Sequence, residues 1–162
     1  MATSKSITFT LLVHDSMNML SSQERNLMEL AVTARKKAYA PYSKFNVGAA
    51  VLLENGEVVL GNNQENASYP SGLCAERVAI FYAGANFPGV KVKAIAITAA
   101  SSSHQVATPA APCGNCRQAI AEYEYKQDSP IKLYLMGETG SVVECGSLSD
   151  LLPLGFNSSF LK

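Results

Sequence analysis

The sequence predicts an α/β fold in which helices cover a mixed sheet. Segments with apolar residues at helical spacing alternate with short apolar runs that are typical of strands. One pair of such runs is joined by Glu54-Asn55-Gly56-Glu57, which has the Asn-Gly centre of a hairpin turn. The 162 residues, of which 48% are hydrophobic and 16% charged, fit one domain with one core, so we treat 1–162 as a single domain.

The N-terminal part should form a strand and then a helix. Ile7 to Val13 alternates and is interrupted by threonines, which indicates a strand. Ser21 with Glu24 three residues later forms a capping-box pattern, so a helix should begin there and end near Tyr39, before Pro41. The apolar residues at helical spacing in this helix are Leu27, Leu30, Ala31, Ala34 and Ala38.

The remaining elements are expected to alternate between strands and helices. Phe45 to Leu53 reads as a buried strand, Val58 to Gly61 as its hairpin partner, and Asn62 to Leu73 as a polar loop. Beyond it we expect a helix from about Cys74 to Ala85, a strand at Val92 to Ala99, a loop at Ala100 to Pro112, a helix from Cys113 to near Lys126, strands at Ile131 to Met136 and Ser141 to Cys145, and a helical turn at Leu148 to Leu152.

Charge and hydropathy exclude several classes of function. The chain has 13 basic and 13 acidic residues, so it lacks the basic surplus of a nucleic-acid binder, and a small, weakly charged substrate fits better. Its apolar runs are far shorter than the roughly 20 residues that a membrane-spanning helix needs. Because Met1 to Ser6 is polar and no secretory signal follows, we expect a cytoplasmic protein that does not bind membranes.

Three cysteines stand where two predicted helices begin, and they have the spacing of metal ligands. Cys113 and Cys116 are three residues apart, so on a helix they share one face and can bind one ion, with Cys74 supplying a third sulfur. Three protein ligands leave a fourth position for water, as in catalytic zinc sites. Helix N-termini favour anions, which prepares the thiolates for a metal.

Glu76 and Arg77 follow Cys74 directly. Glu76 is two residues from Cys74, so it is poorly placed to bind the same ion and well placed to stand beside water at the metal as a catalytic proton carrier. Three thiolates and Zn²⁺ carry one net negative charge, which Arg77 could offset. Arg117 is a weaker candidate for that role, and each arginine could instead be an ordinary solvated helix residue.

The chain resembles the cytidine deaminase family from about Ser22 to Phe156. The resemblance is carried by Cys74-Ala75-Glu76 followed by Pro112-Cys113-Gly114-Asn115-Cys116, and the first motif begins with Cys, as in the branch that acts on free nucleosides. It implies a three-layer α/β/α fold and one zinc ion per chain. It also implies hydrolysis of cytidine and deoxycytidine to the uridines and ammonia in pyrimidine salvage, by a homotetramer with shared active sites.

The same resemblance implies the substrate-binding residues. Phe45, in the segment that begins at Pro41, would face the pyrimidine, and backbone atoms near Ala75 would hydrogen-bond it. Asn63 and Glu65 would bind the ribose 3′-hydroxyl, since an amide and a carboxylate together offer a donor and a strong acceptor. Phe156, after Leu151-Leu152-Pro153, would reach a neighbouring subunit's site.

Two features of the sequence depart from the family pattern. Residues 1–20 form a short N-terminal extension, and the 100–112 loop, which contains His104, is long.

Three rival functions stay open. One rival is another deaminase with similar motifs, such as one that acts on blasticidin S. A second is a non-catalytic zinc module in which Cys145 completes a four-sulfur site, and a third is a thiol redox protein that uses Cys113 and Cys116.

Overall fold

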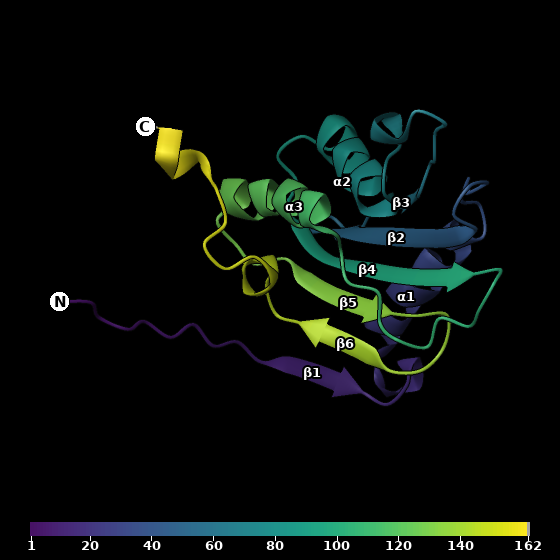
Figure 1. Ribbon diagram of the computed structural model, residues 1–162, viewed down its shortest axis with the longest axis horizontal. Coiled ribbons are helices and arrows are strands. Elements are labelled where there is room, and N and C mark those ends of the chain that lie inside the picture. Colours follow the sequence, from purple (N-terminus) through teal and green to yellow (C-terminus); the bar gives the residue numbers. More distant parts are fainter. Residues whose placement is uncertain (162) are drawn as a thin grey trace.

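A mixed six-stranded sheet forms the centre of the molecule in the computed structural model, which describes residues 1–161 (Figure 1). Its strand order is β1-β6-β5-β4-β2-β3. β4 and β5 are parallel, and the other neighbouring strands are antiparallel. The strands are β1 (Leu11–His14), β2 (Phe45–Leu53), β3 (Val58–Asn62), β4 (Val92–Ser101), β5 (Lys132–Met136) and β6 (Val142–Cys145).

Helices cover both faces of the sheet, which confirms the three-layer α/β/α prediction. Helix α1 (Ser22–Arg35) packs on one face, and α2 (Ala75–Asn86) and α3 (Gly114–Gln127) pack on the other (Figure 1). The buried apolar side chains form two clusters, one between α1 and the sheet and one beneath α2 and α3. None of the helices described over residues 1–161 is long and apolar enough to cross a membrane.

Helix α1 begins as predicted but ends earlier. Ser21 caps it through the full capping box, with its side chain accepting from the Glu24 N–H and the Glu24 carboxylate accepting from the Ser21 N–H. The expected end near Tyr39 is wrong, because the helix stops at Arg35. The backbone of Tyr39 forms hydrogen bonds with a distant segment in place of helical ones. Its N–H donates to the Asn63 carbonyl, and its carbonyl accepts from the Glu65 N–H.

Two glycines let helix backbones lie directly on the sheet. A Cβ at Gly48 in β2 would clash with the backbone of α1 at Ala31, and a Cβ at Gly61 in β3 would clash with the carbonyl oxygen of Ala75 at the start of α2. The second contact fixes the N-terminus of α2, and with it Cys74, against the end of β3. Both strands otherwise lie within a residue of their predicted bounds.

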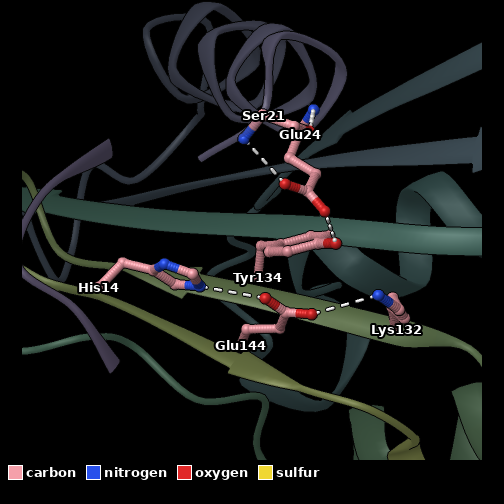
Figure 2. Close-up of polar contacts among 6 residues, drawn as sticks. All are labelled: His14, Ser21, Glu24, Lys132, Tyr134 and Glu144. Atoms are coloured by element: carbon pink, nitrogen blue, oxygen red, sulfur yellow. Dashed lines mark hydrogen bonds and ion pairs between the residues drawn. The ribbon is translucent and has the colours of Figure 1, made fainter. Parts of the chain in front are cut away.

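The N-terminal strand is shorter than expected. We predicted a strand from Ile7 to Val13, but β1 covers only Leu11–His14, because its partner β6 offers four residues and Leu11 already pairs with the last of them. Side chains reinforce this edge: His14 Nε2 lies 3.0 Å from the carboxylate of Glu144, which also accepts from Lys132 Nζ at 3.2 Å (Figure 2). On the same face, the Tyr134 hydroxyl donates to Glu24 of α1.

The other elements follow the expected order. Helices α2 and α3 and strands β4 and β5 begin and end within two residues of the predicted bounds. The segments expected as loops at 62–73 and 100–112 are loops except at their first residues, because β3 includes Asn62 and β4 continues to Ser101. Short 3₁₀ turns occur at Met17–Met19, Tyr69–Ser71, Leu148–Leu151 and Ser158–Leu161.

Candidate functional site

The three predicted cysteine ligands meet where α2 and α3 begin. Cys74 is the N-cap of α2, Cys113 is the N-cap of α3, and Cys116 lies in the first turn of α3. Their sulfur atoms all lie within 4.8 Å of one another, with 3.9 Å between Cys74 and Cys113 and 3.5 Å between Cys113 and Cys116. Sulfurs at about 2.3 Å from a tetrahedral zinc would be about 3.8 Å apart. The spacing and the soft donor set therefore fit zinc.

The fourth cysteine lies apart from this cluster. Cys145 is in β6, fully buried, and its thiol donates to the Ser147 carbonyl at 3.0 Å. Among residues 1–161 the group of three thiols is the one set of side chains that could hold a metal ion. The structure therefore does not support the alternative in which Cys145 completes a four-sulfur site.

The surroundings of Cys74 favour the ionised thiolate that a metal requires. Hydrogen bonding from the Cys116 thiol, together with the Arg77 guanidinium, lowers the pKa of the Cys74 thiol to about 5 against the opposing effect of burial. Cys116, which donates to Cys74 and is itself buried, has a raised pKa. Arg77 Nη2 lies 4.0 Å from the Cys74 sulfur, and Arg77 Nε is buried without a hydrogen-bond partner among residues 1–161.

Arg117 behaves differently from Arg77. Its Nε donates to the Pro112 carbonyl and its Nη1 to the Leu151 carbonyl, both at 2.8 Å. The guanidinium thus ties the start of α3 to the C-terminal segment. Of the two arginines, Arg77 is the one whose guanidinium reaches the sulfur cluster.

Glu76 is a buried carboxyl beside the thiols. It is the second residue of α2 and only 4% exposed. Burial raises its pKa, and the negative charge of Cys74 raises it further. A carboxyl with a raised pKa takes up and releases protons nearer to neutral pH than an ordinary one does, which suits general acid–base chemistry.

A pocket of about 410 Å³ opens beside Cys74. Its volume lies within the range of small-molecule sites. The structure brings Asn63 and Glu65 into this pocket with Cys74 and Arg77, although these residues come from different parts of the sequence. The other residues that line it are Tyr42, Ser43, Gln64, Asn66, Tyr69, Gly72 and Leu73.

Asn63 and Glu65 are both held by the chain that leads into β2. The Asn63 amide donates to the Phe45 carbonyl at 2.9 Å and accepts from the Val47 N–H at 2.8 Å. The Glu65 carboxylate accepts from the Tyr42 and Ser43 N–H groups and from the Ser43 hydroxyl. The Ser43 hydroxyl is the main reason that the pKa of Glu65 is lowered.

The three other predicted substrate residues take different positions. Phe45 is the first residue of β2 and partly exposed, and Ala75 is the fully buried first residue of α2. Phe156 is 55% exposed, stacks on Phe160, and is not among the residues that line the pocket of its own chain. Sequence reasoning missed Ser43, which stands within the Pro41-to-Ala50 segment singled out for Phe45.

Fold and site together define an α/β protein with a three-thiol metal centre next to a buried carboxyl. A family model described as the cytidine and deoxycytidylate deaminase zinc-binding region matches residues 21–128, which include all three thiols and Glu76. The chain belongs to this family, and its thiol cluster fits the family's zinc.

Individual relatives agree with this assignment. A cytidine deaminase of Halalkalibacterium halodurans is 42% identical over 132 residues, which are 82% of this chain and 92% of the relative. The crystal structure of a cytidine deaminase from Burkholderia pseudomallei has a TM-score of 0.72 and 41% identity, covering 85% of this chain and all of that one. A cytidine deaminase from Mycobacterium tuberculosis has a TM-score of 0.64 at 31% identity, over 84% of this chain and 98% of that one.

Proposed function

We propose that this chain is a zinc-dependent cytidine deaminase that hydrolyses cytidine and 2′-deoxycytidine to the corresponding uridines and ammonia, a step of pyrimidine salvage. The observation that carries the proposal is the buried Glu76 carboxyl beside the three thiols, of which Cys74 lines a pocket together with Asn63 and Glu65. Relatives that are named cytidine deaminases and match most of the chain support the same activity.

Cys74, Cys113 and Cys116 would hold one zinc ion per chain. Bound zinc supplies a Lewis acid that lowers the pKa of water. The three thiolates donate negative charge and weaken that effect, so the reaction needs a protein group that accepts the proton. Arg77 offsets the charge of the thiolates at the Cys74 sulfur, which lies 4.0 Å from its guanidinium.

Glu76 would carry the protons of the reaction. Its carboxylate takes a proton from the attacking water and delivers it to N3 of cytosine, which makes C4 electrophilic. The oxygen adds to C4. Glu76 then takes the remaining proton from the new C4 hydroxyl and passes it to the 4-amino group, so that C4=O forms as the C4–N bond breaks, and ammonia leaves with uridine as the other product. Burial of the carboxyl supports this role because it raises the pKa.

The substrate would lie in the pocket beside Cys74. Asn63 and Glu65 bind the 3′-hydroxyl, Phe45 packs against the pyrimidine, and backbone atoms near Ala75 hydrogen-bond the base. This arrangement is supported by the pocket itself, which is lined by Asn63, Glu65 and Cys74.

We also propose that the enzyme is a homotetramer in which Phe156 completes a neighbouring subunit's site. Phe156 is half exposed and stands outside its own pocket. Aromatic side chains on the outer surfaces of α2 and α3 are also exposed, at Phe81, Tyr82 and Tyr125. Exposed aromatic residues are enriched at protein interfaces, so these side chains favour association.

A substrate panel tests the activity. Purified zinc-loaded protein is incubated with cytidine, deoxycytidine, deoxycytidylate and blasticidin S, while ammonia release and the ultraviolet absorbance of the base are followed. We expect both nucleosides to be converted and the other two compounds to react poorly. If cytidine releases no ammonia while another compound does, the substrate assignment is wrong.

A further inference from the structure

The Ser43 hydroxyl joins two parts of the pocket that lie far apart in the sequence. It donates to Glu65 Oε1 and accepts from the backbone N–H of Phe45 at 3.0 Å. One hydroxyl thus contacts both the Glu65 carboxylate, which would face the sugar, and the backbone of Phe45, whose ring would face the pyrimidine.

Glu65 has little freedom to turn. Its Oε2 accepts from the Tyr42 N–H at 2.9 Å and from the Ser43 N–H at 3.2 Å, while Oε1 receives the Ser43 hydroxyl. An ionised carboxylate only accepts, and its two oxygens offer about four lone-pair positions. Three of these are used by the chain, and the fourth can take one donor from a ligand.

Asn63 supplies the complementary group. One N–H of its amide donates to the Phe45 carbonyl, and its oxygen accepts from the Val47 N–H, which leaves the second N–H of the same nitrogen to donate. A hydroxyl is the ligand group that can give a proton to Glu65 and accept one from Asn63.

We propose that Ser43 is a positioning residue for sugar recognition, which fixes the Glu65 carboxylate so that it accepts from the substrate's 3′-hydroxyl. The inference rests on the proposed nucleoside deaminase activity. Ser43 acts through Glu65 and not on the base, so its contribution is confined to substrates that carry a 3′-hydroxyl. A substrate without that group has nothing to gain from an oriented carboxylate.

Two variants of equal shape isolate the hydroxyl. Ser43→Thr keeps it and Ser43→Val lacks it, and both add the same branch, so their difference reports the hydrogen bond. Steady-state kinetics are measured with cytidine, 2′-deoxycytidine and 2′,3′-dideoxycytidine. Thr33→Ala, which removes another exposed hydroxyl bonded to a carbonyl of α1, is the control and should match the wild type.

We expect Ser43→Val to have a KM roughly threefold to tenfold above that of Ser43→Thr for the first two substrates, with kcat unchanged, as loss of one hydrogen bond predicts. With 2′,3′-dideoxycytidine the two variants should agree. An equal loss on all three substrates would show that Ser43 acts through Phe45 or the fold of the loop and would overturn the proposal, as would equal KM values throughout. Wild-type turnover of cytidine tests the deaminase assignment separately.

Discussion

Glu76 lies beside the thiols and Glu65 lines the pocket that opens at Cys74, and the surroundings of these two carboxyls move their pKa values in opposite directions. Burial raises the pKa of Glu76, whereas the Ser43 hydroxyl and two backbone N–H groups lower that of Glu65. Pairs of titratable groups with divergent pKa values mark a division of roles in active sites. In the mechanism that we propose, the division separates a proton carrier, Glu76, from a fixed hydrogen-bond acceptor, Glu65.

Glu76→Gln should abolish nearly all turnover while the protein keeps its fold and its zinc. The amide preserves size but cannot carry protons, and general acid–base catalysis contributes on the order of 10²–10⁴-fold. Because one group serves several transfers, kcat should fall at least about that much. Glu122→Gln, an exposed glutamate on α3, is the control and should stay active. Substantial activity of the Glu76 variant at saturating zinc would remove Glu76 from the mechanism.

The cysteines should divide into two classes when replaced by Ala. Cys113→Ala removes one of three clustered sulfurs, so zinc content and activity should be lost together. Cys145→Ala removes a buried thiol outside the cluster, so the protein should keep one zinc per chain and lose only stability, on the order of 1 kcal/mol. Metal analysis of the purified variants measures both. Loss of zinc from the Cys145 variant would revive the structural-site alternative.

Among the elements, α3 is held to the C-terminal part of the chain by a buried carboxylate in addition to Arg117. Glu124 is 6% exposed and accepts from the Ile131, Leu148 and Ser149 N–H groups. Burial opposes its ionisation, but hydrogen bonds from Ser149, Ile131, Ser147 and Leu148 outweigh burial and lower the pKa. Glu124 thereby joins α3, the start of β5 and the Leu148–Leu151 turn.

Glu124→Gln should lower the free energy of unfolding at neutral pH by about 3 kcal/mol, because the amide leaves buried N–H donors unpaired. The pKa is lowered in the folded state, so this stabilisation is present above the unfolded-state value of about 4.3 and disappears as pH falls through the lower folded-state value. Thermal unfolding from pH 7 to pH 3 should therefore show the two proteins converging in acid. A constant difference across that range would contradict the carboxylate's role.

Local patterns predicted the elements well where neighbours in sequence decide the structure. The capping box at Ser21, the buried run from Phe45 to Leu53 and the Asn-Gly turn all act within a few residues. The end of α1 and the start of β1 were wrong because they depend on distant partners, on Asn63 for Tyr39 and on the length of β6 for Leu11.

The same distinction holds for the site. The thiols and Glu76 stand in two short motifs whose spacing already indicated a metal centre, and the structure brings the three sulfurs together. The hydrogen bond between Ser43 and Glu65 joins residues 22 apart in the sequence. No sequence pattern indicates such a pair, so the bond could be found only in the structure.

For the whole molecule, the shared-site proposal predicts that association and activity are linked. Phe156→Ala should raise KM several-fold, since an aromatic contact contributes about 0.5–1.5 kcal/mol beyond its buried area, and should leave zinc content intact. If subunits exchange, mixing Phe156→Ala chains with Glu76→Gln chains should restore some intact sites in hybrids. Light scattering gives the oligomeric state. An enzyme that is fully active as a monomer would end the proposal.

The pairing of β1 with β6 also orders events while the chain is being synthesised. His14 and Glu144, which meet across these strands, are 130 residues apart in the sequence. The ribosome makes β1 before β6, so the apolar residues of β1 are exposed without a partner strand, and such unpaired segments are prone to aggregate. The edge of the sheet stays open until β6 emerges, so β1 stays unpaired while the 130 residues from His14 to Glu144 are made.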